Sequence, residues 1–326
     1  MKRLLAITIF MTLALALAYS VVGVKDASAD AILAPSFRTD GSFITFVTVV
    51  NKSSNTQLHW MYRYDDPSTP TVNECFHADG FSKTTQNDMF TVDISDTVNG
   101  GAPVPDALDT TSTSYNIGSG WLGYLTIYAF TGTYGTGTEV PTAQGTINSE
   151  IVIANLATGE LYSYKASNDP AGIDEGDFAF TGDITWTVNG VTNPGYATAI
   201  WHPTAAVATQ WYILPVDDDL AFGSDLIKVS LGNVEGAPGF FYDINENPWS
   251  ATSGKEFNCF AFLKLSDLIA PASLVKTALG GWARVVWVDE GGSTEVSSIL
   301  VYKLETTTAL TGATQSAFTS QNRVDW

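Results

Sequence analysis

The sequence predicts an all-β protein: an antiparallel β-sandwich of Ig-like or jelly-roll-like type, with long polar loops and at most one short helix. Aromatic residues make up 12% of the 326 residues and charged residues only 15%, a composition typical of strands joined by polar turns. Residues 43–50 are rich in β-branched and aromatic residues, and the polar run 51–55 separates them from a similar segment at 58–64. We expect these two segments to form an antiparallel hairpin.

Further short runs of the same composition follow along the chain. Residues 147–155 and 161–165, joined by a turn that contains Gly159, predict a second hairpin. Residues 282–288 are almost continuously apolar, which indicates a strand buried on both faces. We expect other strands at 89–94, 121–130, 183–188, 210–214, 225–229, 257–265 and 296–304.

One segment has helical character. Residues 265–279 predict a helix with Ser266 as its N-cap, and Pro271 limits it to a turn or two. Long polar loops, at 99–120, 131–137 and 189–202, separate the strands and are where recognition surfaces are commonly found.

The first 31 residues predict export. Lys2 and Arg3 precede an apolar run at 4–24, and small residues follow at 27–29. This order is that of a secretory signal peptide covering 1–29, with an alternative cleavage after residue 31. An uncleaved membrane anchor is the competing interpretation. The mature chain has no second apolar run of about 18 residues, so we expect no transmembrane segment in it and a periplasmic, cell-surface or extracellular location.

The length and charge of the chain restrict its organisation and partners. Residues 30–326 would form a single large β unit, or two packed sandwiches with a boundary near 166–180. The formal net charge is −19, and removal of 1–29 would make it more negative, because three basic residues and one acidic residue leave. A field of that sign repels nucleic acid and anionic lipid, so nucleic-acid partners are excluded.

Two cysteines, Cys75 and Cys259, are present. In an oxidising compartment such a pair predicts one disulfide, which would join an early strand to a late one. A competing interpretation takes Cys75 and His77 as half of a metal site completed by His59, His202 or an acid. The third alternative is two free thiols.

Acidic clusters are candidates for calcium, and no organic cofactor is predicted. Asp243, Asn245 and Asn247 place oxygen-bearing side chains at alternate positions, as in a calcium loop. No cluster has the complete EF-hand pattern, so a solvated acidic loop is the alternative. The other clusters are Asp217, Asp218 and Asp219 followed by Asp225, and Asp169, Asp174, Glu175 and Asp177.

Catalytic motifs are missing from the sequence. It has no Gly-x-Ser-x-Gly, His-Glu-x-x-His or phosphate-binding loop motif, and each of its three histidines adjoins an aromatic residue. We therefore expect no enzymatic activity. Trp121, Trp201 and Trp249 border Gly- or Asn-rich loops, and a flat indole can stack on a sugar ring, although burial in the core is the alternative.

Several short segments resemble a family of uncharacterised secreted bacterial β-rich proteins. These are residues 31–35, 47–51 and 58–62, the Cys-x-His at 75–77, the late second cysteine, and the Gly-Gly-Trp at 280–282. The resemblance implies export and a β fold, and it implies no activity.

Taken together, the sequence predicts a secreted structural or adhesive cell-surface protein whose partners are itself or other cell-surface components. Assembly into a layer or filament would have one candidate mechanism: Ala31, Ile32 and Leu33 add a strand to a neighbour's open sheet edge. The alternative is that they pair within their own sheet. The competing functions are an extracellular carbohydrate- or calcium-binding module and a secreted glycoside-active enzyme.

Overall fold

The structure is a computed structural model. It describes residues 31–52, 56–65, 76–95, 103–104, 117–132, 140–142, 146–168, 187–188, 191–192, 197–216, 227–233, 237–257, 260–289, 298–307 and 315–320. The predicted signal peptide at 1–29 lies outside these residues.

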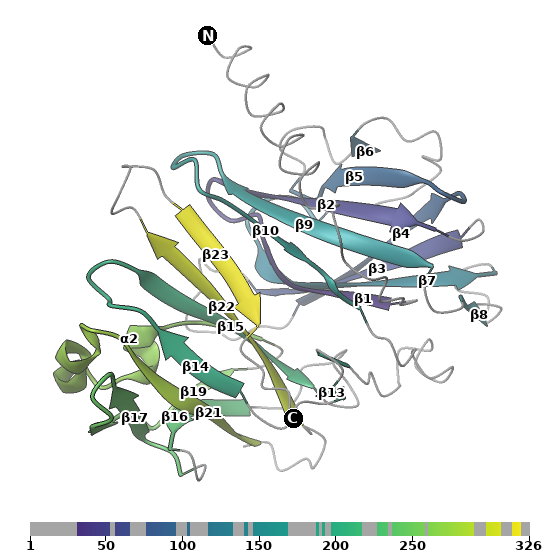
Figure 1. The fold of residues 1–326 in the computed structure, drawn as a ribbon. Helices are drawn as coiled ribbons and strands as arrows, with labels where there is room; N and C mark the ends of the chain where they lie inside the picture. The colour runs from purple at the N-terminus through teal and green to yellow at the C-terminus, as the bar shows by residue number, and fades with distance from the viewer. Residues whose placement is uncertain are drawn as a thin grey trace.

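Two antiparallel sheets formed by residues 31–168 pack face to face as the first sandwich (Figure 1). Alternate side chains of both sheets are fully buried between them, including Val47 and Ile127. Sheet I has the order β10 (Leu161–Lys165), β9 (Ile147–Asn155), β2 (Phe43–Asn51), β5 (Met89–Asp93) and β6 (Pro103–Val104). Sheet II has the order β11 (Ser167–Asn168), β1 (Ala31–Arg38), β7 (Leu122–Thr131), β3 (Thr56–Asp65) and β4 (Phe76–Thr84), with β8 (Val140–Pro141) beside β7.

Residues 197–320 form the second sandwich. Its core contains Trp201 and Val285 from one sheet and Trp211 and Val301 from the other. Sheet III has the order β18 (Pro248–Ser250), β17 (Phe240–Asp243), β21 (Gly281–Asp289), β16 (Ile227–Gly232) and β19 (Lys255–Phe257), with β14 (Ala197–Trp201) beside β21. Sheet IV has the order β20 (Ala261–Lys264), β15 (Ala208–Val216), β22 (Ser298–Thr307) and β23 (Gln315–Ser320). A separate two-stranded ladder joins β12 (Thr187–Val188) to β13 (Val191–Thr192).

The all-β antiparallel sandwich prediction is confirmed, but the first hairpin is wrong. β2 pairs with β5 and β9 in sheet I, whereas β3 pairs with β4 and β7 in sheet II. The chain crosses from one sheet to the other between them, because each strand has an apolar face that the opposite sheet covers. The second predicted hairpin, β9 with β10, is confirmed.

The helical prediction is confirmed in outline. Helix α2 (Leu265–Leu268) ends shortly before Pro271, where the 3-10 helix η2 (Pro271–Thr277) begins. The N-cap is Lys264 instead of Ser266. No helix in the described ranges has the length and hydropathy to cross a membrane.

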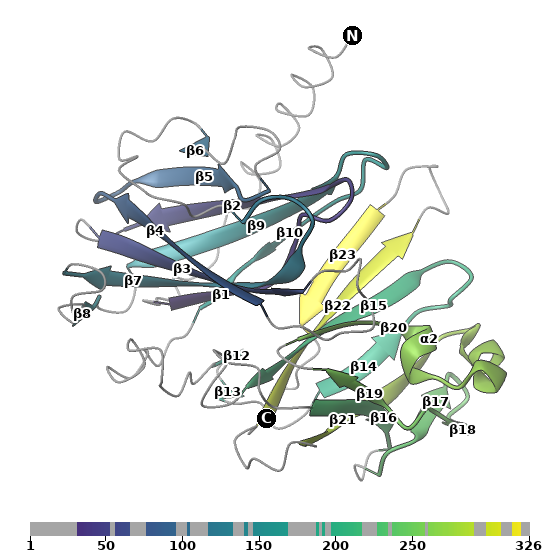
Figure 2. The ribbon, with the colours of Figure 1, turned by 180° about the vertical axis from the view of Figure 1, so that it is seen from behind.

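Sheet IV is buried on both faces, which joins the two sandwiches. Along β15, Trp211 and Ile213 enter the core of the second sandwich, while Tyr212 and Leu214 enter the core of the first. Figures 1 and 2 show β23 of this sheet lying against the sheet I side of the first sandwich. Described residues on both sides of the predicted boundary at 166–180 therefore contribute to the core of the first sandwich, while the second sandwich also has a core of its own.

Sheet III has one covered face and one open face. Along β21, Ala283 and Val285 are buried, whereas Trp282, Arg284 and Val286 are half-buried and Val288 is exposed. The expectation that 282–288 is buried on both faces is therefore wrong for this strand, because among the described residues no second layer packs on its outer side.

Candidate functional site

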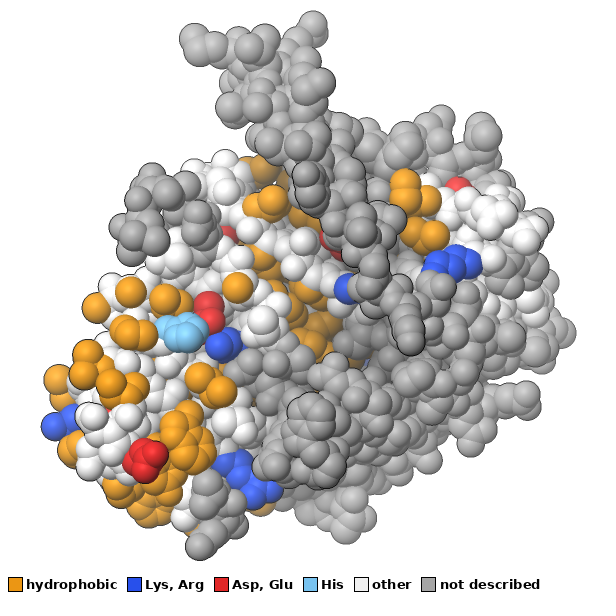
Figure 3. Space-filling model, viewed as in Figure 1, with side chains coloured by type: hydrophobic (Ala, Val, Ile, Leu, Met, Phe, Trp, Pro, Cys, Tyr) orange, Lys and Arg blue, Asp and Glu red, His pale blue; other side chains and the backbone are white. Residues whose placement is uncertain are grey.

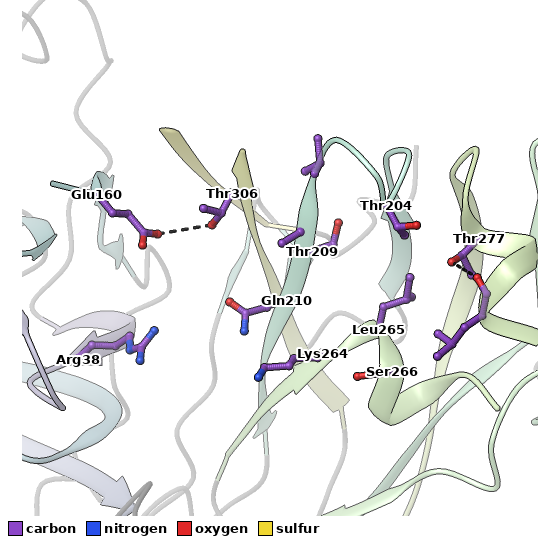
Figure 4. A pocket seen from close by; sticks show the side chains of 13 residues that line it. Arg38, Glu160, Thr204, Thr209, Gln210, Lys264, Leu265, Ser266, Thr277 and Thr306 are labelled. Atoms are coloured by element: carbon purple, nitrogen blue, oxygen red, sulfur yellow. Dashed lines mark hydrogen bonds between the residues drawn. The ribbon is translucent and has the colours of Figure 1, made fainter. Parts of the chain in front are cut away.

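A pocket of about 530 Å³ opens at the junction of the two sandwiches, and we call it the junction pocket. Its polar end combines Arg38 and Glu160 of the first sandwich with Gln210, Lys264 and Thr306 of sheet IV. Figure 4 shows Arg38 and Glu160 across the pocket from Gln210 and Lys264. The volume lies in the range of small-molecule binding sites, which are common at domain junctions.

Arg38 is held rigidly at this end of the pocket. Its Nε and Nη2 atoms donate to the two carboxylate oxygens of Asp40 at 2.9 and 2.7 Å. The guanidinium carbon lies 3.7 Å from the centre of the Phe43 ring and 5.4 Å from that of Phe262. Burial acts to lower the pKa of Arg38, but the hydrogen bond to Asp40 and nearby charges outweigh it, so the pKa is raised and the group stays cationic.

Glu160 supplies the carboxylate of the pocket. Its Oε1 atom accepts hydrogen bonds from Ser316 at 2.7 Å and Thr306 at 3.5 Å, both in sheet IV. These bonds attach the turn before β10 to the second sandwich. The pocket is therefore lined by side chains whose positions depend on the packing between the two sandwiches.

The second candidate surface is the open side of sheet III, which we call the outer face. It combines Ile200, Phe240, Tyr242 and Trp282 with Val288, and Arg284 lies on the same side of β21 between Trp282 and Val288. Trp282 of β21 lies between Ile200 of β14 and Tyr242 of β17 in register. The rings of Tyr242 and Trp282 stack with centroids 4.8 Å apart. Ile200 is 47% exposed and Val288 52%. Figure 3 shows hydrophobic side chains gathered over the region of β17 and its neighbours.

Two glycines allow this face to form. Gly280, the residue immediately before β21, has φ +99°, which favours glycine. A Cβ on Gly281 would come within 2.6 Å of the buried Trp201 ring and 2.5 Å of the Tyr242 carbonyl oxygen. The Gly-Gly-Trp at 280–282 thus lets β21 pass directly over Trp201 while Trp282 points outward.

Asp243, Asn245 and Asn247, the residues of the predicted calcium loop, form a hydrogen-bonded turn. The Asp243 Oδ1 atom accepts from the backbone N–H groups of Asn245 and Asn247 at 2.8 and 3.1 Å, and Oδ2 accepts from the Trp249 indole at 2.9 Å. The Asn247 amide also donates to this carboxylate. Hydrogen bonds to its carboxylate lower the pKa of Asp243 to about 2, and the bond from the Trp249 indole has the largest effect. The N–H donors of this turn thus hold the Asp243 carboxylate in place, and calcium binding by these residues stays a prediction.

Other predicted site residues lie outside the described residues. These are Cys75 and Cys259, the acidic residues Asp217, Asp218 and Asp219 with Asp225, and the cluster at 169–177. Within the described part of the chain, no group of three or more His, Cys, Asp and Glu side chains is placed to hold a metal ion.

The three candidate tryptophans lie in different surroundings. Trp201 is 2% exposed, with Trp211 and Phe241 packed edge-on against its ring, so the prediction that it stacks on a sugar is wrong. Trp121 is half-buried beside Tyr64, at 4.8 Å between centroids. Trp249 is half-buried, with the Lys276 ammonium 4.3 Å above its ring. The structure does not bring these three together.

The predicted assembly segment is part of its own sheet. Ala31, Ile32 and Leu33 pair with Tyr128, Ile127 and Thr126 of β7, and Ile32 and Leu33 also pair with β11. Ile32 is 1% exposed and Leu33 is fully buried. The alternative stated from the sequence, pairing within the same chain, is the arrangement observed here.

Sequence reasoning missed both candidate surfaces. The five residues at the polar end of the junction pocket come from five separate segments of the chain, so no local motif marks them. For the outer face a signal existed, because Trp282, Val286 and Val288 alternate with Ala283 and Val285 in a way that also suits a strand with one open face.

No family model matches the chain, and no curated protein matches it. Among solved structures, the chain is similar to a member of glycosyl hydrolase family 2 from Bacteroides cellulosilyticus, with 12% identity and a TM-score of 0.16. The match covers 89% of this chain and 28% of that one, so the chain spans less than a third of that protein's length. A likeness at this level assigns neither fold nor activity.

Proposed function

We propose that the protein is an exported structural or adhesive protein of the cell surface, and that the outer face of sheet III is its contact surface. Export is supported by the charge, apolar run and small residues of the first 31 positions. A rigid body is supported by sheet IV, which contributes to the cores of both sandwiches.

The observation that carries the proposal is the apolar outer face. Phe240 is 42% exposed and adjoins the stacked pair of Tyr242 and Trp282, while Ile200 flanks Trp282 on the other side. Soluble monomers seldom expose contiguous apolar patches of this kind unless the patch contacts another molecule. The stacked aromatic pair presents a flat surface, which suits contact with a second chain or a polymer.

The test uses the mature chain and the double variant Tyr242→Ser with Trp282→Ser. Light scattering measures self-association, and cosedimentation with envelope fragments of the producing cell measures adhesion. We expect the wild type either to self-associate or to bind the envelope fragments, and we expect the double variant to lose that property. The control is Met89→Ser, which removes an apolar side chain that is 59% exposed on the first sandwich.

Retention of both properties by the double variant would overturn the assignment of the face. A wild-type monomer that binds no envelope fraction would overturn the structural or adhesive role itself. A folded double variant, checked by circular dichroism, is required for either conclusion.

The junction pocket favours carbohydrate binding as a second function. It places a carboxylate, an amide, hydroxyl groups and two cations around one cavity, beside the apolar side chains of Val207, Leu265 and Leu274. Sugar rings present both hydroxyl groups and apolar C–H faces, so this mixture of lining groups matches them.

A further inference from the structure

We propose that the junction pocket binds an acidic saccharide, with the carboxylate of the sugar held by Arg38 and Lys264. This inference rests on the proposed surface role, because it names the ligand through which an adhesive protein would hold an extracellular polymer. It uses a site different from the outer face.

The first argument is the local charge. The chain carries 34 acidic and 15 basic residues, yet the pocket is lined by Arg38 and Lys264 against the single carboxylate of Glu160. Asp40 neutralises part of the Arg38 charge through two hydrogen bonds. The exposed Lys264 has no ion pair with any described residue. Asp40 and Glu160 together balance the two cations, so the pocket is close to neutral in a chain of net negative charge, and an anion would be bound there through the directed donors of Arg38 and Lys264.

The second argument is the donor geometry. A guanidinium has five N–H donors in one plane, and Asp40 occupies two of them. Stacking on Phe43 at 3.7 Å fixes the plane of the group. Figure 4 shows Lys264 and Gln210 extending toward Arg38 from the opposite side. A carboxylate placed there would contact a fixed planar donor and a flexible ammonium.

The third argument distinguishes a saccharide from a small inorganic anion. The cavity of about 530 Å³ is much larger than one phosphate group. The Gln210 amide makes no hydrogen bond with a described residue, and neither does the Oε2 atom of Glu160, so both can serve sugar hydroxyl groups. The buried side chain of Leu265 and the half-buried Leu274 line the far end, where the C–H face of a ring would pack.

The experiment is calorimetric titration of the mature protein with a β-1,4-linked glucuronate trimer and with cellotriose, which has an uncharged hydroxymethyl group in place of each carboxylate. We expect the glucuronate trimer to bind at least tenfold more tightly, and its affinity to fall as salt is raised. Equal affinity for the two trimers, or binding of neither, would overturn the proposal. Inorganic phosphate is the third probe, and displacement of the trimer by an equal concentration of phosphate would show a general anion site instead.

The matched variants are Lys264→Gln and Lys255→Gln. Each removes one exposed ammonium group, but only Lys264 lines the pocket. Loss of one charge-assisted contact should weaken trimer binding about tenfold in Lys264→Gln and leave it unchanged in Lys255→Gln. An unchanged affinity in Lys264→Gln, with an unchanged melting temperature, would contradict the assignment.

Failure of this inference is separable from failure of the proposed function. The double variant of Tyr242 and Trp282 should lose self-association or envelope binding and keep the glucuronate affinity. Lys264→Gln should lose glucuronate affinity and keep self-association or envelope binding.

Discussion

Phe318 of β23 stacks on Tyr164 of β10, with ring centroids 4.5 Å apart and an angle of 27° between the planes. The same ring lies 5.6 Å from Tyr302 and 5.7 Å from Tyr212, both in sheet IV. A half-buried residue near the end of the chain thus joins sheet I of the first sandwich to sheet IV of the second. Ser316, on the same strand, donates to Glu160 of the junction pocket, so β23 contacts both the aromatic cluster and the pocket.

Replacing Phe318 with Ala should loosen the junction. Removal of a fully buried Phe side chain costs about 3–5 kcal/mol, and half-burial reduces the expected loss of unfolding free energy to about 2 kcal/mol. Differential scanning calorimetry should show either a lower melting temperature or two separated transitions. Met89→Ala, on an exposed side chain, is the control. A single transition at the wild-type temperature would show that this aromatic contact does not hold the sandwiches together.

Leu33 tests the role of the first strand. It is fully buried in β1 between β7 and β11, so Leu33→Ala should lower the free energy of unfolding by about 2–5 kcal/mol. Deletion of residues 30–37 should then unfold the first sandwich, as followed by circular dichroism. A deleted chain that stays a folded monomer and merely loses its polymers would favour strand donation between chains.

The stability of the turn between β17 and β18 should depend on pH through the carboxylate of Asp243. Its pKa is lowered from the ordinary value of 3.8 to about 2, so its hydrogen bonds stabilise the folded turn above about pH 4. That stabilisation is lost as the pH falls from about 4 to about 2, since the carboxylate then takes up a proton. Fluorescence of Trp249, obtained as the difference from Trp249→Phe, should change over this window. Asp243→Asn should abolish the change, and persistence of the same titration in that variant would assign it to another group.

The residues next to the two cysteines contact neighbouring parts of the first sandwich, and the disulfide prediction itself can be tested by thiol titration. Phe76, next to Cys75, lies 6.2 Å from the Trp121 ring, and Phe260, next to Cys259, lies 6.2 Å from the Tyr124 ring. Both contacts fall at the start of β7. We expect the mature protein to have no titratable thiol when denatured without reductant, and reduction should lower its melting temperature.

Single and double replacement of the cysteines provides the control for that prediction. If they form one bond, Cys75→Ala, Cys259→Ala and the double variant should lose similar amounts of stability, because each breaks the same bond. Additive losses, or two titratable thiols in the wild type, would contradict the disulfide.

The sequence by itself determined the local features of this protein. Runs of β-branched and aromatic residues placed β5, β7, β9, β10, β15, β16, β21 and β22, and Pro271 separated α2 from η2, because these preferences depend on neighbouring residues alone. The less regular strands β4, β14, β17, β18 and β23 were missed, and the expected strand at 257–265 is divided between β19 and β20.

Only the tertiary structure decided which strands pair and which faces are covered. A strand such as β3 can pair with any strand that offers backbone groups, so its partner depends on how the whole apolar surface is buried. The same holds for Trp201 and Trp282, two aromatic residues beside similar loops: one lies in the core and the other on the outer face. The junction pocket lies where Phe318 contacts Tyr164 and Ser316 contacts Glu160, pairs that are more than 150 positions apart in the chain. No local sequence pattern predicts contacts over such a separation.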